Sequence, residues 1–141
     1  MTPLITLKVI GAPVGQPRVR ATIRGGHAGV YTDPKHAVHG FKAAIDLAWV
    51  MAGRPFLSGG LVMSARFVFP RPKSMTWKRK PMPREPMTGK PDLDNVVKAV
   101  QDALNGKAYA DDAQIVRYGS VEKCYAAGDE EPHVMVWIGR A

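Results

Sequence analysis

The chain contains, at residues 91–106, the stretch PDLDNVVKAVQDALNG, in which two acids come immediately before an expected helix. The helix is expected over about residues 95–104, and the asparagine and glycine that follow end it as a left-handed cap. The proline ahead of the acids keeps the preceding residue extended. In an extended segment, side chains two residues apart face the same way. Asp92 and Asp94 can therefore share one space beside the helix N-terminus.

The neighbouring segments predict the rest of an α+β domain, with a small mixed β-sheet packed against two main helices. Apolar alternation indicates strands at residues 6–10, 61–69, 115–118, 121–125 and 133–138. A second helix is expected to begin with Asp33 as its N-cap and Pro34 at its first position. Its apolar stripe recurs at helical spacing and comprises Val38, Phe41, Ala44, Ile45, Ala48 and Trp49. We expect one compact domain over residues 1–141.

Two segments break this periodicity. Residues 15–26 are basic, polar and rich in glycine, which predicts a loop or an irregular edge. Residues 70–91 hold six prolines and seven lysines or arginines with a single acid, Glu85. We expect residues 70–91 to form a long basic loop that is mobile without its ligand.

The overall charge favours a partner that is rich in phosphate. Lysine and arginine total 20 against 12 acidic residues, which gives a formal net charge of +8 and an isoelectric point near 9.9. Cys124 is the only cysteine, so an intrachain disulfide and a thiolate zinc site are both excluded. No basic leader precedes an apolar stretch, and no apolar run is long enough to span a bilayer. We therefore expect a cytoplasmic protein with no membrane partner.

Two acid pairs flank the central helix, because Asp111 and Asp112 follow it as Asp92 and Asp94 precede it. The helix is about 15 Å long at about 1.5 Å per residue, and the six extended steps from Gly106 onward span up to about 20 Å. The return segment is therefore long enough to bring the second pair beside the first. Clustered carboxylates repel one another unless a cation neutralises them. Ligands that are all oxygen favour Mg²⁺ or Mn²⁺ over Zn²⁺.

Lys98 lies one helical turn after Asp94, where its ammonium could contact a scissile phosphate or stabilise charge in the transition state. Each residue alone also has a simpler interpretation. The acids before the helix can cap it, Lys98 can pair with Asp94 and Asp102, and the second acid pair can form a turn. The joint pattern of two acid pairs, an aligned lysine and a basic loop favours a metal-dependent nuclease.

Residues 90–106, followed by YADDAQIV at residues 109–116, resemble the RusA family of Holliday-junction resolvases, small endonucleases often carried by phages and prophages. Weaker similarity covers QPRVR at residues 16–20 and YTDPK at residues 31–35. The resemblance implies a RusA-like fold. It also implies Mg²⁺-dependent cleavage of branched DNA by a homodimer, in DNA recombination and repair.

The resemblance assigns roles by motif position. Asp92, Asp94 and Asp112 would be the catalytic and metal-binding acids, Asp111 a supporting acid and Lys98 the catalytic lysine. The expected cofactor is Mg²⁺, for which Mn²⁺ can substitute. As a hypothesis, metal-activated water attacks the phosphodiester in line and leaves 5′-phosphate ends. A two-fold dimer would then place paired symmetric nicks across a four-way junction.

Basic residues in two segments are the expected phosphate contacts. They are Arg18, Arg20, Arg24, Arg71, Lys73, Lys78, Arg79, Lys80, Arg84 and Lys90. A solvated charged loop is the simpler interpretation of the second segment. Trp77 either stacks on an unpaired base or is buried against the dimer partner.

Two other functions fit parts of the pattern. A basic module of the same fold could bind DNA or RNA without cutting it, although the intact acids argue against this. A nucleotidyl or glycosyl transferase could hold a diphosphate with Asp92 and Asp94. The chain is short for a nucleotide-sugar domain, however, and it has no glycine-rich phosphate loop. A structure-selective endodeoxyribonuclease is the function that we expect.

Overall fold

The computed structural model describes residues 2–77 and 81–141. Its elements follow one another as β1 (Ile5–Ile10), β2 (Arg20–Arg24), β3 (His27–Tyr31), α1 (Val38–Met51), β4 (Leu61–Phe69), the short 3-10 helix η1 (Lys73–Met75), β5 (Glu85–Pro86), α2 (Leu93–Leu104), the 3-10 helix η2 (Asp112–Gln114), β6 (Ile115–Tyr125) and β7 (His133–Arg140).

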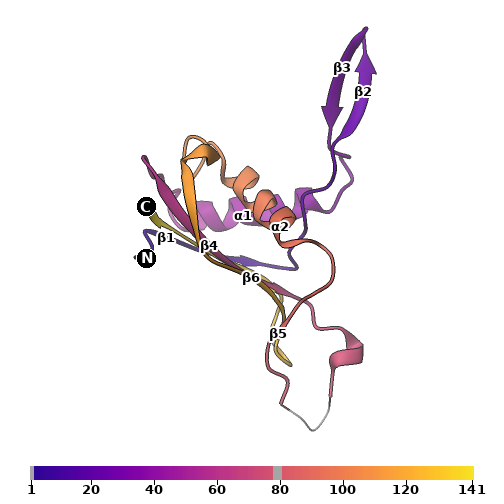
Figure 1. Ribbon diagram of the computed structural model, residues 1–141, viewed down its shortest axis with the longest axis vertical. Coiled ribbons are helices and arrows are strands. Elements are labelled where there is room, and N and C mark those ends of the chain that lie inside the picture. Colours follow the sequence, from indigo (N-terminus) through magenta and orange to yellow (C-terminus); the bar gives the residue numbers. More distant parts are fainter. Residues whose placement is uncertain (1, 78–80) are drawn as a thin grey trace.

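A mixed five-stranded sheet forms the centre of the domain, in the order β1-β7-β4-β6-β5 (Figure 1). β4 pairs with β6 in parallel, and the other pairings in this sheet are antiparallel. Because β4 lies in the middle of the sheet, its residues are buried except for the half-buried Arg66. The predicted α+β class with one small mixed sheet is confirmed.

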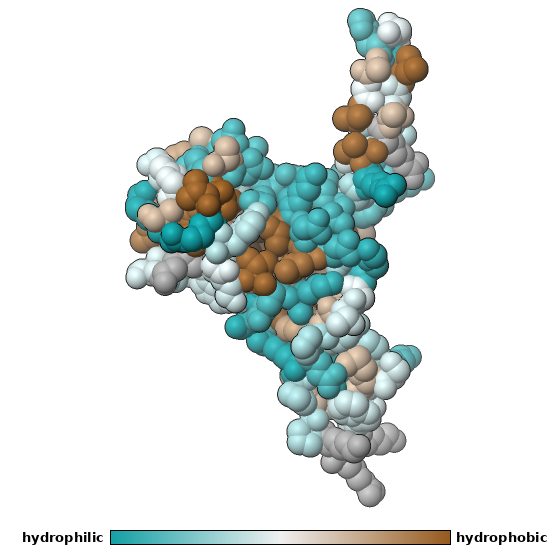
Figure 2. Space-filling model, in the orientation of Figure 1, coloured by the Kyte–Doolittle hydropathy of each residue, from teal (hydrophilic) through white to brown (hydrophobic). Residues whose placement is uncertain are grey.

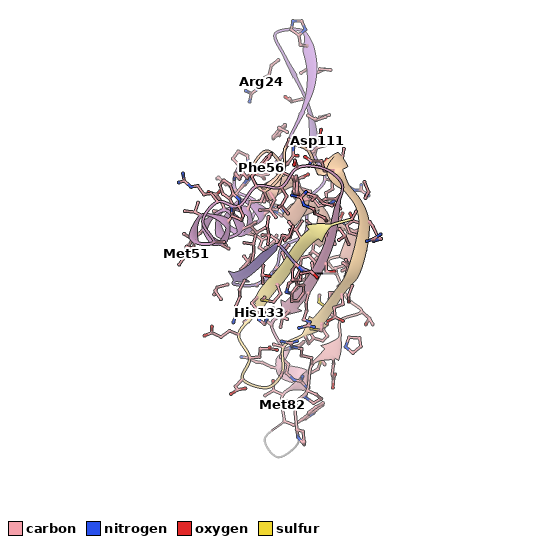
Figure 3. All side chains as sticks on the ribbon, turned by 90° about the vertical axis from the view of Figure 1, so that its left-hand side faces the viewer. Arg24, Met51, Phe56, Met82, Asp111 and His133 are labelled. Atoms are coloured by element: carbon pink, nitrogen blue, oxygen red, sulfur yellow. The ribbon has the colours of Figure 1, made fainter. Side chains whose placement is uncertain are left out.

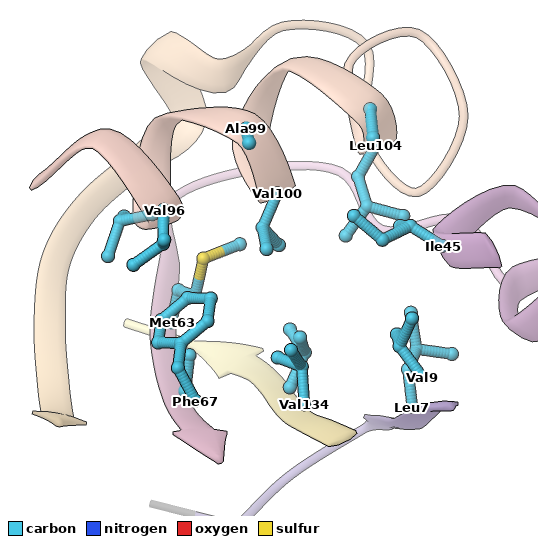
Figure 4. Packing of buried hydrophobic residues seen from close by; sticks show 14 of the residues in the cluster. Leu7, Val9, Ile45, Met63, Phe67, Val96, Ala99, Val100, Leu104 and Val134 are labelled. Carbon is cyan, nitrogen blue, oxygen red and sulfur yellow. The ribbon is translucent and has the colours of Figure 1, made fainter. Parts of the chain in front are cut away.

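Helices α1 and α2 contribute to one hydrophobic core with β1, β4 and β7 (Figure 4). Val96 and Val100 of α2 point toward the sheet, where Met63 and Phe67 of β4 lie opposite them, and Leu104 lies beside Ile45 of α1. All of these side chains are fully buried. Burial stabilises the fold by about 1.5–3 kcal/mol for each side chain of this size. This packing therefore fixes where α2 lies on the sheet, and with it where both ends of the helix lie.

Helix α1 has the predicted buried stripe but begins later than predicted. Oδ1 of Asp33 accepts the backbone N–H of Lys35 at 2.9 Å, which closes a turn before the helix. The predicted start at Asp33 and Pro34 is therefore wrong, because the aspartate oxygen is used in the turn. Ala37 is the N-cap residue, and the helix begins at Val38.

Residues 20–31 form a β-hairpin of β2 and β3, although a loop or an irregular edge was expected. Gly25 and Gly26 connect the strands and have φ angles of 58° and 79°. Two consecutive residues of positive φ are what a tight hairpin turn requires, and glycine adopts them without strain. The prediction was wrong because the basic, glycine-rich composition concealed two short alternating strands around a Gly-Gly pair.

The remaining boundaries differ from the predictions by a few residues. Residues 115–118 and 121–125 belong to one continuous strand, β6, whose pairing with β4 shifts register near Ser64. Gly119 lies against Ser64 there, with no room for a side chain. α2 begins at Leu93, and Gly106 follows its end with the predicted positive φ, 76°. No helix within residues 2–77 and 81–141 has the length and apolar character needed to cross a membrane.

Candidate active site

The first acid pair lies at the N-terminus of α2. Asp92 is the N-cap residue and Asp94 lies in the first turn, and both are exposed. Asp92 makes no side-chain capping bond, so helix capping does not account for its carboxylate. Lys90 Nζ donates to Asp92 Oδ1 at 2.8 Å, and this hydrogen bond, together with the charges of Lys90 and Lys123, holds the pKa of Asp92 below its ordinary value. This end of α2 therefore presents a carboxylate that stays ionised.

The second acid pair lies at the opposite end of α2. Asp111 caps η2, since its side chain accepts the backbone N–H of Ala113 at 3.0 Å and the Gln114 side chain accepts the N–H of Asp111 at 3.1 Å. The backbone N–H of Asp112 donates to Oδ1 of Asn105, the C-cap residue of α2, at 2.8 Å. These bonds hold the second pair beside the C-terminus of the helix.

The two charged side chains that shift the pKa of Asp112, Asp111 and Asp102, are both acidic. Partial burial raises the pKa of Asp112, the neighbouring side chain of Asp111 raises it further, and the charge of Asp102 adds to this. The ionised form of Asp112 is thus disfavoured where it stands. A cation placed at this point would relieve the repulsion.

The two pairs do not meet within one chain, so the expected convergence is wrong. α2 has 12 residues and is about 18 Å long, and it separates them (Figure 1, where the orange turn lies at the far end of α2 from the salmon segment that leads into the helix). The return segment is not extended. The N–H of Ala108 donates back to the Leu104 carbonyl at 3.1 Å, and the buried Tyr109 donates its hydroxyl to the Gln101 carbonyl at 2.9 Å. Because the return segment folds back to bury Tyr109, it is too short to reach the first acid pair.

Among the described residues, no three acidic, histidine or cysteine side chains lie together in a group that could hold an ion. Residues 2–77 and 81–141 of a single chain therefore form no complete metal site.

A groove of about 680 Å³ runs between α2 and residues 16–19. α2 contributes Asn95, Lys98 and Asp102 to its wall. The backbone N–H of Gln16 donates to the Asn95 carbonyl at 2.9 Å, which ties the segment to the helix. A volume of this size is in the range of ligand sites, and Lys98 and Arg18 give this one two cations.

Lys98 is exposed in this groove and, within residues 2–77 and 81–141, it takes part in no ion pair. Asp102 instead lies 4.0 Å from the ammonium of Lys42. The simpler interpretation, in which Lys98 pairs with Asp94 and Asp102, is not supported. The ammonium of Lys98 is therefore available to an anionic ligand.

Gln16 and Asn95 line the groove, although the sequence did not mark them as site residues. Oε1 of Gln16 is buried and has no hydrogen-bond partner in the described chain. A buried acceptor without a partner costs about 1–3 kcal/mol, so a water or a ligand donor is expected to bind there. The QPRVR run signalled this segment, but nothing in the sequence placed its glutamine against α2.

Arg71 is a structural residue, and its expected phosphate contact is wrong. Its side chain is 4% exposed, and its guanidinium donates to the carbonyls of Met75 at 2.7 Å and Pro83 at 2.8 Å. It also donates to the Ala126 carbonyl at 3.2 Å and lies 5.1 Å from the centre of the Trp77 ring. The described part of residues 70–91 is organised around this buried guanidinium, and Trp77 packs against it.

The other predicted phosphate contacts differ in their availability. Five are exposed to solvent: Arg18, Arg24, Lys73, Arg84 and Lys90. The ammonium of Lys90 is hydrogen-bonded to Asp92. The guanidinium of Arg84 is occupied by the carboxylate of Glu130. Lys78, Arg79, Lys80 and the side chain of Arg20 lie outside the described residues.

Known proteins match most of the chain. The family described as Endodeoxyribonuclease RusA matches residues 11–139. A protein of Bacillus subtilis (strain 168), "Uncharacterized protein YqaN", is 37% identical over 141 aligned residues, which cover 95% of this chain and 94% of the relative. The family match includes the groove, α2 and both acid pairs.

Gly15→Ala should displace the next segment of the chain from α2. A Cβ at Gly15 would lie 2.8 Å from Cβ of Pro91, closer than side chains approach one another. We expect the free energy of unfolding to fall by about 1–3 kcal/mol. We also expect faster hydrogen exchange at the Gln16 amide, whose bond to α2 would weaken. Gly89→Ala is the control, since its Cβ would meet only Tyr125 at 3.8 Å. Equal stability and exchange in the two variants would contradict the tight packing.

Glu130→Gln should destabilise the protein in a pH-dependent way. Arg84 donates to both oxygens of Glu130, at 2.9 and 2.5 Å, and this pairing lowers the pKa of Glu130 to about 2 from an ordinary 4.5. A depressed folded-state pKa stabilises the fold above the ordinary value, and this stability is lost as the pH falls toward 2.

In denaturant unfolding at pH 7, the free energy of unfolding of Glu130→Gln should be lower than that of the parent by about 1 kcal/mol, after allowance for solvent screening. This difference should become smaller at pH 2.5. Glu131→Gln is the control, because it removes the same charge at the next, exposed residue. A deficit of the same size at both pH values would show that the ion pair is not its cause.

Proposed function

The chain belongs to the RusA endodeoxyribonuclease family, and we propose that it is a metal-dependent endonuclease that resolves four-way (Holliday) DNA junctions by paired symmetric nicks. The observation that supports this most directly is an acid pair at each end of a helix whose exposed side forms a groove with Lys98 and Arg18. The net charge of +8 attracts a polyanion to such a surface.

The proposed cofactor is Mg²⁺, for which Mn²⁺ can substitute. Oxygen ligands suit both ions, and Asp92, Asp94 and Asp112, with Asp111 in support, would supply them. When bound, such an ion provides an activated water and neutralises charge on the leaving oxygen. Four carboxylates at two ends of α2 do not fit a single ion within one chain.

A homodimer would resolve this mismatch. In a two-fold pair, Asp92 and Asp94 of one copy can face Asp112 of the partner subunit, and symmetry then generates two equivalent sites. Two sites related by a two-fold axis suit two symmetric nicks. The proposed enzyme is therefore active only as a pair of chains.

The outer side of α1 supports a dimer. Leu47, Val50 and Met51 are exposed at helical spacing, on the side away from the buried Val38 and Ile45. Figure 3 shows Met51 at the outer end of α1, away from the sheet. A helix that is apolar on both sides is typical of one that is covered on both sides. In a two-fold dimer, a second copy of the chain would bury this apolar side of α1.

Lys98 is the proposed contact to the scissile phosphate, since its ammonium is exposed in the groove. Exposed cations away from the groove would contact phosphates along the DNA arms and so fix the register of the complex. These are Arg24, Lys73 and Lys90, together with the predicted contacts Arg20, Lys78, Arg79 and Lys80.

A basic module that binds DNA without cutting it is the alternative. The separation of the acid pairs within one chain is the observation that favours it. Both functions predict salt-sensitive DNA binding. Only the nuclease predicts a product that depends on Mg²⁺.

Asp94→Asn should lower the rate of nicking by about a thousandfold or more. Junction binding should stay the same or become tighter, because a charge that repels DNA is lost. A labelled four-way junction, with fork, flap and linear duplexes for comparison, is incubated with Mg²⁺ or with EDTA. Asp129→Asn, an equal charge change on an exposed turn, is the control. Nicking by Asp94→Asn at the parental rate would contradict the assignment. A parent that binds junctions but never cuts them would establish the binding module.

Met51→Glu should weaken self-association by about tenfold or more, because a charge would replace an apolar side chain at the proposed interface. Met51 is 79% exposed in the single chain, so the change leaves the core intact. Light scattering over a concentration series measures the dissociation constant. Leu4→Glu, at an exposed apolar position outside α1, is the control. Finding the parent monomeric at concentrations where it nicks DNA would contradict the dimer.

A further inference from the structure

The β2–β3 hairpin stands away from the body of the domain (Figure 1). Its two strands pair with each other in a sheet of their own and do not join the five-stranded sheet. All five residues of β3 are exposed. An isolated two-stranded hairpin is marginally stable in water. A bound partner would therefore complete this element.

One face of the hairpin is apolar. The register pairs Ala21 with Val30 and Ile23 with Ala28, and directly opposed residues of an antiparallel pair lie on the same face. Ile23 and Val30 are 77% and 69% exposed. Figure 2 shows brown, hydrophobic side chains along the hairpin, well clear of the body. Within residues 2–77 and 81–141, no other element covers Ile23 and Val30 on this face.

The opposite face is polar and basic. Arg24 is paired with His27, and Thr22 with Gly29. Figure 3 shows Arg24 projecting from the side of the hairpin. The sequence has no Asp or Glu between residues 11 and 32. A surface with cations and no anion attracts phosphate.

The hairpin also continues directly from the groove of the proposed active site. Arg18 and Val19 line that groove with Lys98, and β2 begins at the next residue. DNA that reaches Lys98 would therefore lie at the base of the hairpin.

We propose that the β2–β3 hairpin is an arm that enters the branch point of bound DNA, with its apolar face against unstacked bases and its basic face toward phosphates. The proposal rests on the proposed nuclease function and identifies what recognises the branch. A two-stranded ribbon fits within a DNA groove. Apolar side chains that enter base steps unstack and bend the duplex. Because the hairpin has cations and no acids, its surface favours DNA as the binding partner over a second copy of this basic chain.

The test uses the full chain with Asp94→Asn, so that binding is measured without nicking. Ile23→Ser combined with Val30→Ser removes the apolar face and keeps every charge of the hairpin. The affinity for a four-way junction should fall about tenfold, while the affinity for linear duplex stays within about twofold. The signal of 2-aminopurine at the branch point, raised when the parent binds, should return toward that of the free junction.

Two further variants separate this effect from general ones. Leu4→Ser changes an exposed apolar residue outside the hairpin and should leave all three readouts unchanged. Arg24→Ala should weaken junction and duplex binding together and reduce the slope of log affinity against log salt by about one. Circular dichroism should be unchanged throughout, because none of these side chains is buried.

A double variant that binds the junction and the duplex as its parent does would overturn the inference and leave the nuclease function standing. A double variant that becomes monomeric in light scattering would also overturn it, since the apolar face would then belong to a second copy. A parent that does not prefer junctions over duplex would instead overturn the proposed function, because that comparison involves no hairpin variant.

Discussion

Packing of α2 on β4 is the interaction on which the rest of the structure depends. Val96 and Val100 are fully buried against the sheet, and an α-helix is stiff, so the length of α2 becomes a fixed distance between its two ends. One end holds Asp92 and the other holds Asp112. The same packing turns the exposed side of the helix toward residues 16–19 and forms the groove. A single apolar stripe thus positions the acids, the lysine and the binding surface.

The two acid pairs differ in the charges that surround them and in the pKa shifts that result. Asp92 has a lysine partner, and its pKa is lowered. Asp112 lies among other acids, and its pKa is raised. Keeping the pairs at opposite ends of α2 limits the repulsion that four clustered carboxylates would produce in a chain without metal. When a second chain brings the acid pairs together, a bound cation can offset the electrostatic repulsion between them.

Features that depend on local periodicity could be predicted from the sequence. Strands β1, β4, β6 and β7, the buried stripe of α1, the course of α2 and the cap at Gly106 follow from spacing and turn chemistry. The start of α1 was missed because Asp33 has two local uses, and its side chain closes a turn instead of capping the helix. The hairpin was missed because composition hid its alternation.

Features that depend on distant contacts could not be predicted in this way. The length of the return segment sets how far the chain can reach but not where it goes, and burial of Tyr109 decided its path. The sequence predicted that Arg71 is a surface cation. Its neighbours in the sequence do not reveal that its guanidinium is buried and donates to a carbonyl as distant as that of Ala126. Within the candidate site, the sequence therefore identified the residue types, and tertiary packing decided which of them lie together.

Mixing two inactive variants tests most directly whether acids from two chains form one site. Asp94→Asn and Asp112→Asn are each prepared alone, mixed in equal amounts under conditions that exchange subunits, and assayed on a labelled four-way junction with Mg²⁺. In a composite site, each mixed dimer carries both changes in one site and neither in the other. Roughly a quarter of all sites then become intact, and single nicks reappear. If the mixture is as inactive as the separate variants, the acids of each site come from one chain, and the account is contradicted.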